Sequence, residues 1–142
     1  MQDYKIGYTN GVFDLIHVGH LEFLKAAKEK CDHLIVAVCE DELAYKYKGK
    51  YPIIPLKDRI KLLSGIKYVD QVVIQSTTDR ISEWERYHFD VIFHGIDGQE
   101  WDKKNGYFDS LNKLGVKSIY FERPINISTT QIINTILSRY NK

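Results

Sequence analysis

The sequence predicts a single α/β domain built on a doubly wound sheet of five parallel strands. Short β-rich runs alternate with helical patterns, which is typical of successive βαβ units. The run 33–39 is almost entirely apolar, as expected of a central parallel strand buried on both faces. The chain has 142 residues and contains no linker-like tract. Residues 1–142 are therefore expected to form one domain.

Each expected strand is a short run rich in β-branched, apolar or aromatic residues, the types that strands favour. The first run ends at the turn-forming pair Asn10-Gly11, and the second is the apolar run noted above. The third, fourth and fifth each lie between two helical patterns. The expected strands are 5–9, 33–39, 71–75, 91–94 and 116–121.

The expected helices show a 3.6-residue apolar period or a terminal signal. In the first of them Leu24, Ala27 and Cys31 recur at the spacing of one helix face. Gly65 is suited to ending the third helix, and Ser128 to capping the last. The expected helices are 18–31, 41–45, 56–65, 81–88, 108–114 and 129–140, with a basic loop at 46–55 and a polar loop at 95–106.

Charge and composition restrict the partners. Twenty basic and nineteen acidic side chains give a formal charge of +1, which argues against binding to nucleic acid or an anionic membrane. The longest apolar run, 34–39, is far too short to span a bilayer, and the N-terminus lacks the pattern of a signal peptide. Cys31 and Cys39 are interpreted as buried reduced thiols. We expect a cytoplasmic protein whose partners are small molecules or other protein chains.

Ligands of doubly wound sheets bind outside the carboxyl ends of the strands, near the point where the strand order reverses. The segments expected to meet there are 10–20, 41–50, 94–97 and 123–130. Such a sheet is of the Rossmann-like type.

The most informative segment is the turn from the first strand into the first helix. His17 and His20 stand three residues apart, so helical geometry places them on one face. Gly19 leaves the backbone between them open to a bulky anion, and the helix N-terminus adds unpaired N–H groups and partial positive charge. This pattern predicts a phosphate site. Half of a metal site, or two satisfied surface side chains, are the alternatives.

Two motifs in order connect the chain to a known family. The pattern Gly11-x-Phe13-Asp14-x-x-His17-x-Gly19-His20 follows the first strand, and Arg123-x-x-x-Ile-Ser128-Thr129-Thr130 opens the last helix. Together they resemble the cytidylyltransferase branch of the HxGH nucleotidyltransferases. The resemblance covers about residues 5–137.

The resemblance implies a role for each matching position. The catalytic residues would be His17, His20, Lys46 and Arg123. The nucleotide-binding residues would be Thr9, Asn10, Gly11, Val12, Phe13, Asp14, Gly19, Asp41, Lys48, Gly95, Asp97, Ser128, Thr129 and Thr130. The acceptor-binding residues would be Arg59, Lys67 and Asp70.

The match to the family leaves one assignment open and departs from the family pattern at two positions. The lysine that closes over the triphosphate could be Lys46, Lys48 or Lys50. Lys67 stands where some relatives have arginine. The tryptophan that glycerol-phosphate enzymes place after the Gly-x-Asp turn is absent, and Trp101 comes only later.

The reaction that the resemblance implies is transfer of a cytidylyl group from CTP to a small phosphorylated acceptor, most simply glycerol 3-phosphate, with release of pyrophosphate. Mg²⁺ would be bound by the triphosphate, and the sequence assigns it no side-chain ligands. The enzyme would be a homodimer. One alternative is adenylyl transfer to heptose 1-phosphate. Others are cytidylyl transfer to ethanolamine phosphate or choline phosphate, and an inactive nucleotide-binding interaction module.

Overall fold

A five-stranded, all-parallel sheet forms the centre of the computed structural model, which describes residues 2–122 and 127–141. The strand order is β3-β2-β1-β4-β5. Gly7 in the central strand pairs with Leu34 of β2 on one side and with Val91 of β4 on the other. The winding therefore reverses between β1 and β4, as expected for a doubly wound sheet. The strands are β1 Tyr4–Gly11, β2 Cys31–Cys39, β3 Gln71–Gln75, β4 Val91–Gly95 and β5 Lys117–Phe121.

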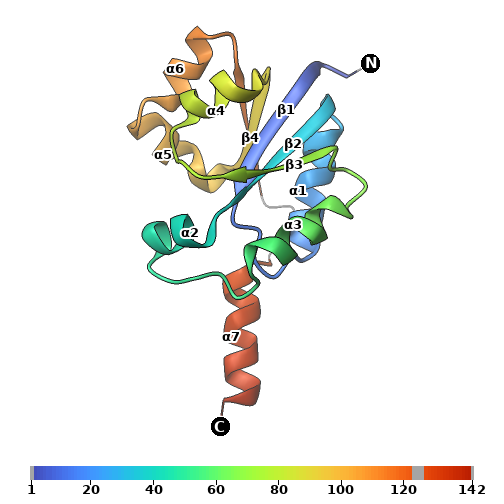
Figure 1. Ribbon diagram of the computed structural model, residues 1–142, viewed down its shortest axis with the longest axis vertical. Coiled ribbons are helices and arrows are strands. Elements are labelled where there is room, and N and C mark those ends of the chain that lie inside the picture. Colours follow the sequence, from blue (N-terminus) through green and yellow to red (C-terminus); the bar gives the residue numbers. More distant parts are fainter. Residues whose placement is uncertain (1, 123–126, 142) are drawn as a thin grey trace.

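Helices cover both faces of this sheet (Figure 1). One core cluster packs residues of α1 and α3 against side chains such as Val36, and a second packs α4 and α6 against the opposite face, around Ile35. This alternation along β2 explains why the run is apolar throughout. The helices are α1 Val18–Lys28, α2 Asp41–Lys48, α3 Leu56–Ser64, α4 Arg80–Tyr87, η1 Ile96–Gly98, α5 Gln99–Lys104, α6 Tyr107–Lys113 and α7 Thr129–Tyr140.

The largest differences from the sequence expectation lie in three places, and β1 also continues through Asn10-Gly11, where the sequence predicts a turn. Helix α1 ends at Lys28, and Cys31 belongs to β2. The sequence predicts this helix too long because Cys31, an apolar residue of a buried strand, happens to continue the helical spacing. Helix α2 continues three residues into the expected basic loop and ends at Gly49 in the left-handed conformation. The expected polar loop at 95–106 contains η1 and α5. Buried Asp102 holds α5 in place by pairing with Arg80 of α4.

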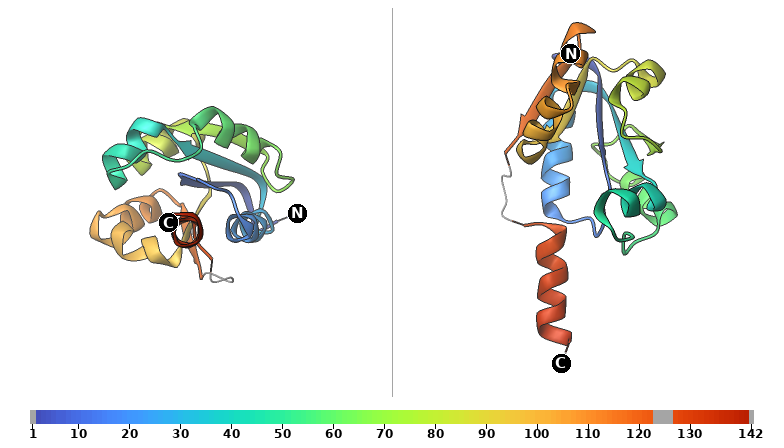
Figure 2. Two further views of the ribbon diagram at one scale, coloured as in Figure 1. Left: turned by 90° about the horizontal axis from the view of Figure 1, so that it is seen from below. Right: turned by 90° about the vertical axis from the view of Figure 1, so that its left-hand side faces the viewer.

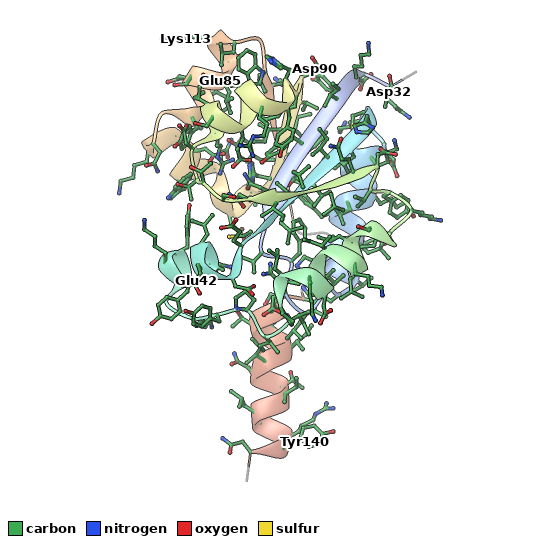
Figure 3. The ribbon with its side chains drawn as sticks, viewed as in Figure 1. Asp32, Glu42, Glu85, Asp90, Lys113 and Tyr140 are labelled. Carbon is green, nitrogen blue, oxygen red and sulfur yellow. The ribbon has the colours of Figure 1, made fainter. Side chains whose placement is uncertain are left out.

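Helix α7 stands away from the rest of the molecule (Figures 1 and 2). None of its residues, all of which the structure describes, is buried. Tyr140 lies at its far end, while Asp32 and Asp90 mark the opposite end of the molecule, where strands begin (Figure 3). Within the described ranges no helix is long and apolar enough to cross a membrane. The carboxyl ends of the strands thus face the base of α7.

Candidate active site

A cleft lies at the carboxyl ends of the strands, where the winding reverses. It consists of two adjoining cavities of about 580 and 500 Å³. The loop after β1, helix α2, the segment after β4 and the start of α7 all contribute to it, as the sequence predicted. The residues common to both cavities are His20, Phe23, Lys48, Gly95, Asp97, Thr129 and Thr130.

Every expected nucleotide-binding residue except Asp41 lines one of these two cavities. Thr9 is buried and donates through Oγ1 to the carbonyl of Phe93 at 2.8 Å, which joins β1 to β4 beneath the cleft. The structure therefore brings together residues from both ends of the chain.

The loop from β1 to α1 is strained and firmly tied. Phe13 and Leu15 have φ of 54° and 49°, a region that non-glycine residues adopt only at a free-energy cost. The Asp14 carboxylate accepts hydrogen bonds from the backbone N–H groups of Ile53 and Ile54 at 2.8 and 2.9 Å. The Asp14 carbonyl accepts another from Thr129 Oγ1 at 2.9 Å. This loop is thereby connected to the segment before α3 and to the start of α7.

His17 and His20 form a reciprocal cap at the start of α1. His17 is the N-cap residue, in extended conformation, and its Nδ1 accepts from the backbone N–H of Gly19 at 3.0 Å. The Nδ1 of His20 accepts from the backbone N–H of His17 at 3.2 Å. The ring centroids lie 4.0 Å apart. A Cβ atom at position 19 would lie 2.8 Å from His17 Cε1, so Gly19 is required by the histidine pair itself.

Burial decides the protonation state of His20, and its hydrogen bond decides which ring nitrogen carries the proton. Burial lowers the pKa of His20 from 6.5 to about 4, and the neighbouring His17 and Lys48 act in the same direction. His20 is therefore neutral at pH 7. Because its Nδ1 accepts a backbone hydrogen bond, the ring proton sits on Nε2. A neutral histidine held this way is a fixed hydrogen-bond donor for a phosphate oxygen.

A second helix N-terminus faces the same cavity as α1. Ser128 caps α7, with its Oγ accepting from Gln131 N at 3.1 Å and its own N–H bonded to Gln131 Oε1 at 3.0 Å. His17 and Gly19 of α1 line this cavity together with Ser128, Thr129 and Thr130. Two helix N-termini directed at one space favour a polyanion there.

The structure distinguishes between the lysines that the sequence left open. Lys48 lines both cavities of the cleft, and Lys50 lines the larger one. Lys46 is exposed and lines neither. Lys48 is therefore the lysine positioned at the junction of the cleft.

Arg59 makes only protein contacts and does not reach the cleft. Its side chain is fully buried. The guanidinium donates to the carbonyls of Ile54, Val12 and Cys39 at 2.8, 2.7 and 2.9 Å. It also pairs with Asp41. Arg59 and Asp41 thus hold the loops around the cleft. The Arg59 side chain is not positioned to make the acceptor contact that the sequence predicts for it.

Two further expected residues, Lys67 and Asp70, do not join the cleft. Asp70 accepts from the backbone N–H of Leu34 at 2.8 Å and pairs with Lys28 at 2.7 Å, at the amino end of the strands. Lys67 lies over the Tyr68 ring, 5.2 Å from its centroid. Arg123 lies outside the described residues. Lys67 and Asp70 are therefore at the wrong edge of the sheet to contact an acceptor in this cleft.

The sequence pattern missed a third cavity, of about 170 Å³, that adjoins the larger one and is lined in part by Arg80 and Trp101. Arg80 is buried; its Nη2 pairs with Asp102 at 3.0 Å and its Nη1 contacts the Nε2 of His94. Burial, followed by the nearby Arg80 charge, holds the pKa of His94 well below its ordinary value. The sequence pattern marks Trp101 only as an aromatic residue displaced from its usual position, and no local signal points to Arg80.

The described carboxylates do not form a metal cage. No group of three or more His, Cys, Asp or Glu side chains that could hold an ion occurs in the described ranges. The Asp14 and Asp41 carboxylates already bind protein groups. Asp97 lines both cavities of the cleft. This arrangement fits a cation carried by a triphosphate, because Mg²⁺ commonly takes one or two carboxylates and completes its shell with phosphate oxygens and water.

Comparison with known proteins agrees with this geometry. Residues 8–135 match the family model described as cytidylyltransferase-like. The chain belongs to the cytidylyltransferase-like family.

Its relatives carry several names within the nucleotidyltransferase superfamily. An FAD synthase from Pyrococcus horikoshii is 40% identical over 133 residues, covering 90% of this chain and 89% of the relative. The bifunctional protein HldE of Gluconacetobacter diazotrophicus is 45% identical over 136 residues, 95% of this chain but 28% of that protein. A probable ethanolamine-phosphate cytidylyltransferase from Encephalitozoon cuniculi is 31% identical over 137 residues, 96% and 41% respectively.

A solved structure gives the same result for the fold. The crystal structure of the lipopolysaccharide core biosynthesis protein from Thermoplasma volcanium superposes with a TM-score of 0.75 at 31% identity, covering 86% of this chain and 99% of that one. The cytidylyltransferase-like family and its named relatives identify an enzyme of the nucleotidyltransferase class.

Proposed function

We propose that this enzyme transfers a cytidylyl group from CTP to a small phosphomonoester, with glycerol 3-phosphate as the leading acceptor, and releases pyrophosphate. The observation that carries the proposal is that the N-termini of α1 and α7 and the side chain of Lys48 meet in one cleft. A triphosphate is the ligand whose charge this arrangement complements. The sequence motif at the start of α7 resembles cytidylyl enzymes and supports CTP as the donor.

The chemistry needs no general base. A phosphomonoester is already ionised near neutral pH, so its oxygen can attack the α-phosphorus of CTP directly. A new P–O bond forms while the bond to the β-phosphate oxygen breaks, and pyrophosphate leaves with that electron pair. Catalysis must then supply placement and stabilise charge on the phosphate oxygens. His20 donates from Nε2, Lys48 supplies positive charge, and the two helix N-termini present N–H groups.

Mg²⁺ bound to the triphosphate would neutralise part of its charge when present. Asp97 is the carboxylate that lines both cavities and would complete the coordination of such a cation. The protein's own part is to hold the triphosphate between α1 and α7.

Adenylyl transfer is the second candidate, and one observation favours it: the FAD synthase relative matches along 89% of its length. On that reading ATP would be the donor and FMN the acceptor. Adenylyl transfer to heptose 1-phosphate, the alternative that the sequence left open, would use the same donor.

The test is pyrophosphate release in the presence of Mg²⁺, with CTP and ATP each crossed against glycerol 3-phosphate, ethanolamine phosphate, heptose 1-phosphate and FMN. We expect release only with CTP, and fastest with glycerol 3-phosphate. Release with ATP and FMN alone would replace the proposal by FAD synthesis. Release with no pair would leave a nucleotide-binding module, which CTP titration would then reveal.

The homodimer and the cytoplasmic location expected from the sequence belong to the same proposal. Exposed apolar side chains on α7 support an interface between chains: Ile136, Leu137 and Tyr140 are 47, 52 and 79% exposed. We expect sedimentation to give twice the chain mass. Leu137→Glu should shift it to the mass of one chain, whereas a protein that sediments as one chain from the start would contradict the dimer.

A further inference from the structure

The third cavity, here called the Arg80 cavity, opens beside the larger part of the cleft and shares Asn10, Gly11 and Lys48 with it. It lies toward α2, α4 and α5, on the side away from Ser128 and the start of α7, which line the other part of the cleft. If the triphosphate lies between α1 and α7, the acceptor phosphate must approach from the Lys48 side. The rest of the acceptor is then directed toward the Arg80 cavity.

A preformed guanidinium lies in the wall of this cavity. Arg80 contacts Asp102 through one terminal nitrogen and His94 through the other. Asp102 is held in turn by a hydrogen bond from Tyr120 Oη at 2.6 Å. The side chains of Arg80 and Asp102 are 11 and 4% exposed. These contacts fix the orientation of the guanidinium before any ligand arrives, which favours a specific polar contact.

Aromatic rings form a second wall. Trp101 lies 6.2 Å from Tyr47 and is stacked on Tyr107 at 5.8 Å, measured between ring centroids. The Arg80 guanidinium carbon is 5.4 Å from the Trp101 centroid. Gln75 and Thr78 add uncharged polar groups to the lining. The cavity thus combines flat apolar surface with hydrogen-bonding groups.

The charges in this wall discriminate against cations. Arg80 and Lys48 are its charged lining residues, and no Asp or Glu lines the cavity in the part of the chain that the structure describes. An ammonium or trimethylammonium group would therefore face two positive charges without a carboxylate partner. A neutral group meets no such penalty, because it carries no charge for Lys48 and Arg80 to repel.

Size excludes a second class of acceptor. About 170 Å³ lies below the roughly 300–1,000 Å³ of pockets that hold drug-sized ligands. A chain of a few hydroxylated carbons can enter, whereas a fused three-ring flavin cannot do so without rearrangement of the walls.

We infer that the Arg80 cavity receives the non-phosphate end of the acceptor and selects an uncharged polyol there, with hydroxyl groups bound to Arg80 and its polar neighbours and carbon atoms against Trp101. This inference rests on the proposed function for the direction from which the acceptor enters. It identifies Arg80, Thr78 and Trp101 as specificity-determining residues.

The first experiment measures binding without turnover. The chain has two tryptophans, and Trp84 of α4 packs against the core cluster around Ile35 without lining the cavity, so tryptophan fluorescence can report on the cavity through Trp101. Glycerol 3-phosphate should change the emission of the wild type and of Trp84→Phe in a saturable way, but not that of Trp101→Phe. Inorganic phosphate should leave the emission unchanged. A response carried by Trp84, or one that inorganic phosphate reproduces, would overturn the inference.

The second experiment alters selectivity. Thr78→Asp places a carboxylate in the cavity, and Ser110→Asp adds the same charge at an exposed position of α6. We expect Thr78→Asp to lower the ratio of kcat/KM for glycerol 3-phosphate over ethanolamine phosphate at least tenfold, with Ser110→Asp unchanged. An unchanged ratio in Thr78→Asp would contradict the assignment.

The two proposals can fail separately. Wild-type turnover that prefers ethanolamine phosphate would overturn the polyol assignment and leave cytidylyl transfer intact. Binding of glycerol 3-phosphate at Trp101 without pyrophosphate release from any nucleotide would overturn the proposed function and leave the cavity assignment intact.

Discussion

Thr129 and Asp14 are joined by a hydrogen bond from the threonine Oγ1 to the aspartate carbonyl oxygen at 2.9 Å. This bond connects the start of the last helix to the loop that carries the paired histidines. The carboxylate of the same Asp14 binds the backbone of Ile53 and Ile54. One residue therefore aligns three segments that surround the cleft.

Replacing Asp14 should affect activity more than stability. Asp14→Ala removes two hydrogen bonds to backbone N–H groups that are partly exposed, so water can replace much of each bond and the free energy of unfolding should fall by only about 1 kcal/mol. We expect kcat/KM to fall at least tenfold while the melting temperature falls by only a few degrees, measured by pyrophosphate release and thermal melting. Asp14→Asn, which keeps one acceptor oxygen, should recover part of the activity. Full activity in Asp14→Ala would show that the loop needs no such anchor.

His20→Ala should lower kcat by about 10²-fold, the typical effect of losing a hydrogen-bond donor to a developing oxyanion. The loss of the cap should reduce the free energy of unfolding by about 1 kcal/mol. The matched control is His33→Ala, since His33 lies near the amino end of β2, away from the cleft, and its Nε2 contacts Gln71 Oε1 at 2.9 Å. Near-normal turnover in His20→Ala would remove His20 from the mechanism.

Substituting Lys48 and Lys46 in turn tests which lysine of the basic segment contacts the triphosphate. Lys48 lines the cleft, whereas Lys46 lines none of its cavities. Because a lysine beside a triphosphate binds it as a point charge, Lys48→Ala should raise KM for the nucleotide or lower kcat at least tenfold. Lys46→Ala should change both less than twofold. The reverse ranking in steady-state kinetics would assign the role to Lys46.

Glu83 should make the stability of the protein pH-dependent. Burial raises its pKa from 4.5 to about 8, and the nearby Arg86 charge acts in the opposite direction. Both carboxylate oxygens are buried, with no hydrogen-bond partner among the described residues. In the folded state the group keeps its proton up to a higher pH, so its contribution is complete below pH 4.5 and is lost as pH rises toward 8.

The neutral isostere tests this directly. Glu83→Gln should raise the free energy of unfolding at pH 8 by about 1–3 kcal/mol and change it little at pH 5, as measured by urea denaturation. An equal change at both pH values would mean that the carboxyl does not titrate in this range.

Arg59 should be essential for folding. Its removal would leave three carbonyl groups and the Asp41 carboxylate without their partner. Each carbonyl group left unpaired costs about 1–3 kcal/mol, so Arg59→Ala should melt far below the wild type. Arg59→Lys should not rescue it, because an ammonium cannot reach four partners in a plane. Wild-type stability with reduced acceptor affinity would instead support direct substrate binding.

The strands, most helices and the location of the cleft could be predicted because their signals are local. The apolar run of β2 and the capping serine at 128 each act within a few residues. The α5 segment could not be predicted, since its main anchor is the pairing of Asp102 with Arg80, 22 positions earlier. The end of α1 was misjudged because Cys31 continues the helical apolar period while belonging to a strand.

By itself the sequence determined the doubly wound sheet, the histidine pair at the start of α1 and the threonines at the start of α7, because each depends on residue type and short spacing. Only the tertiary structure decided that Lys48 rather than Lys46 lines the cleft and that Arg59 is buried and bonded to the surrounding loops. It also decided that Arg80 and Trp101 line one cavity. These outcomes depend on how separate segments pack together, because the position of each of these side chains is set by neighbours that are distant along the chain.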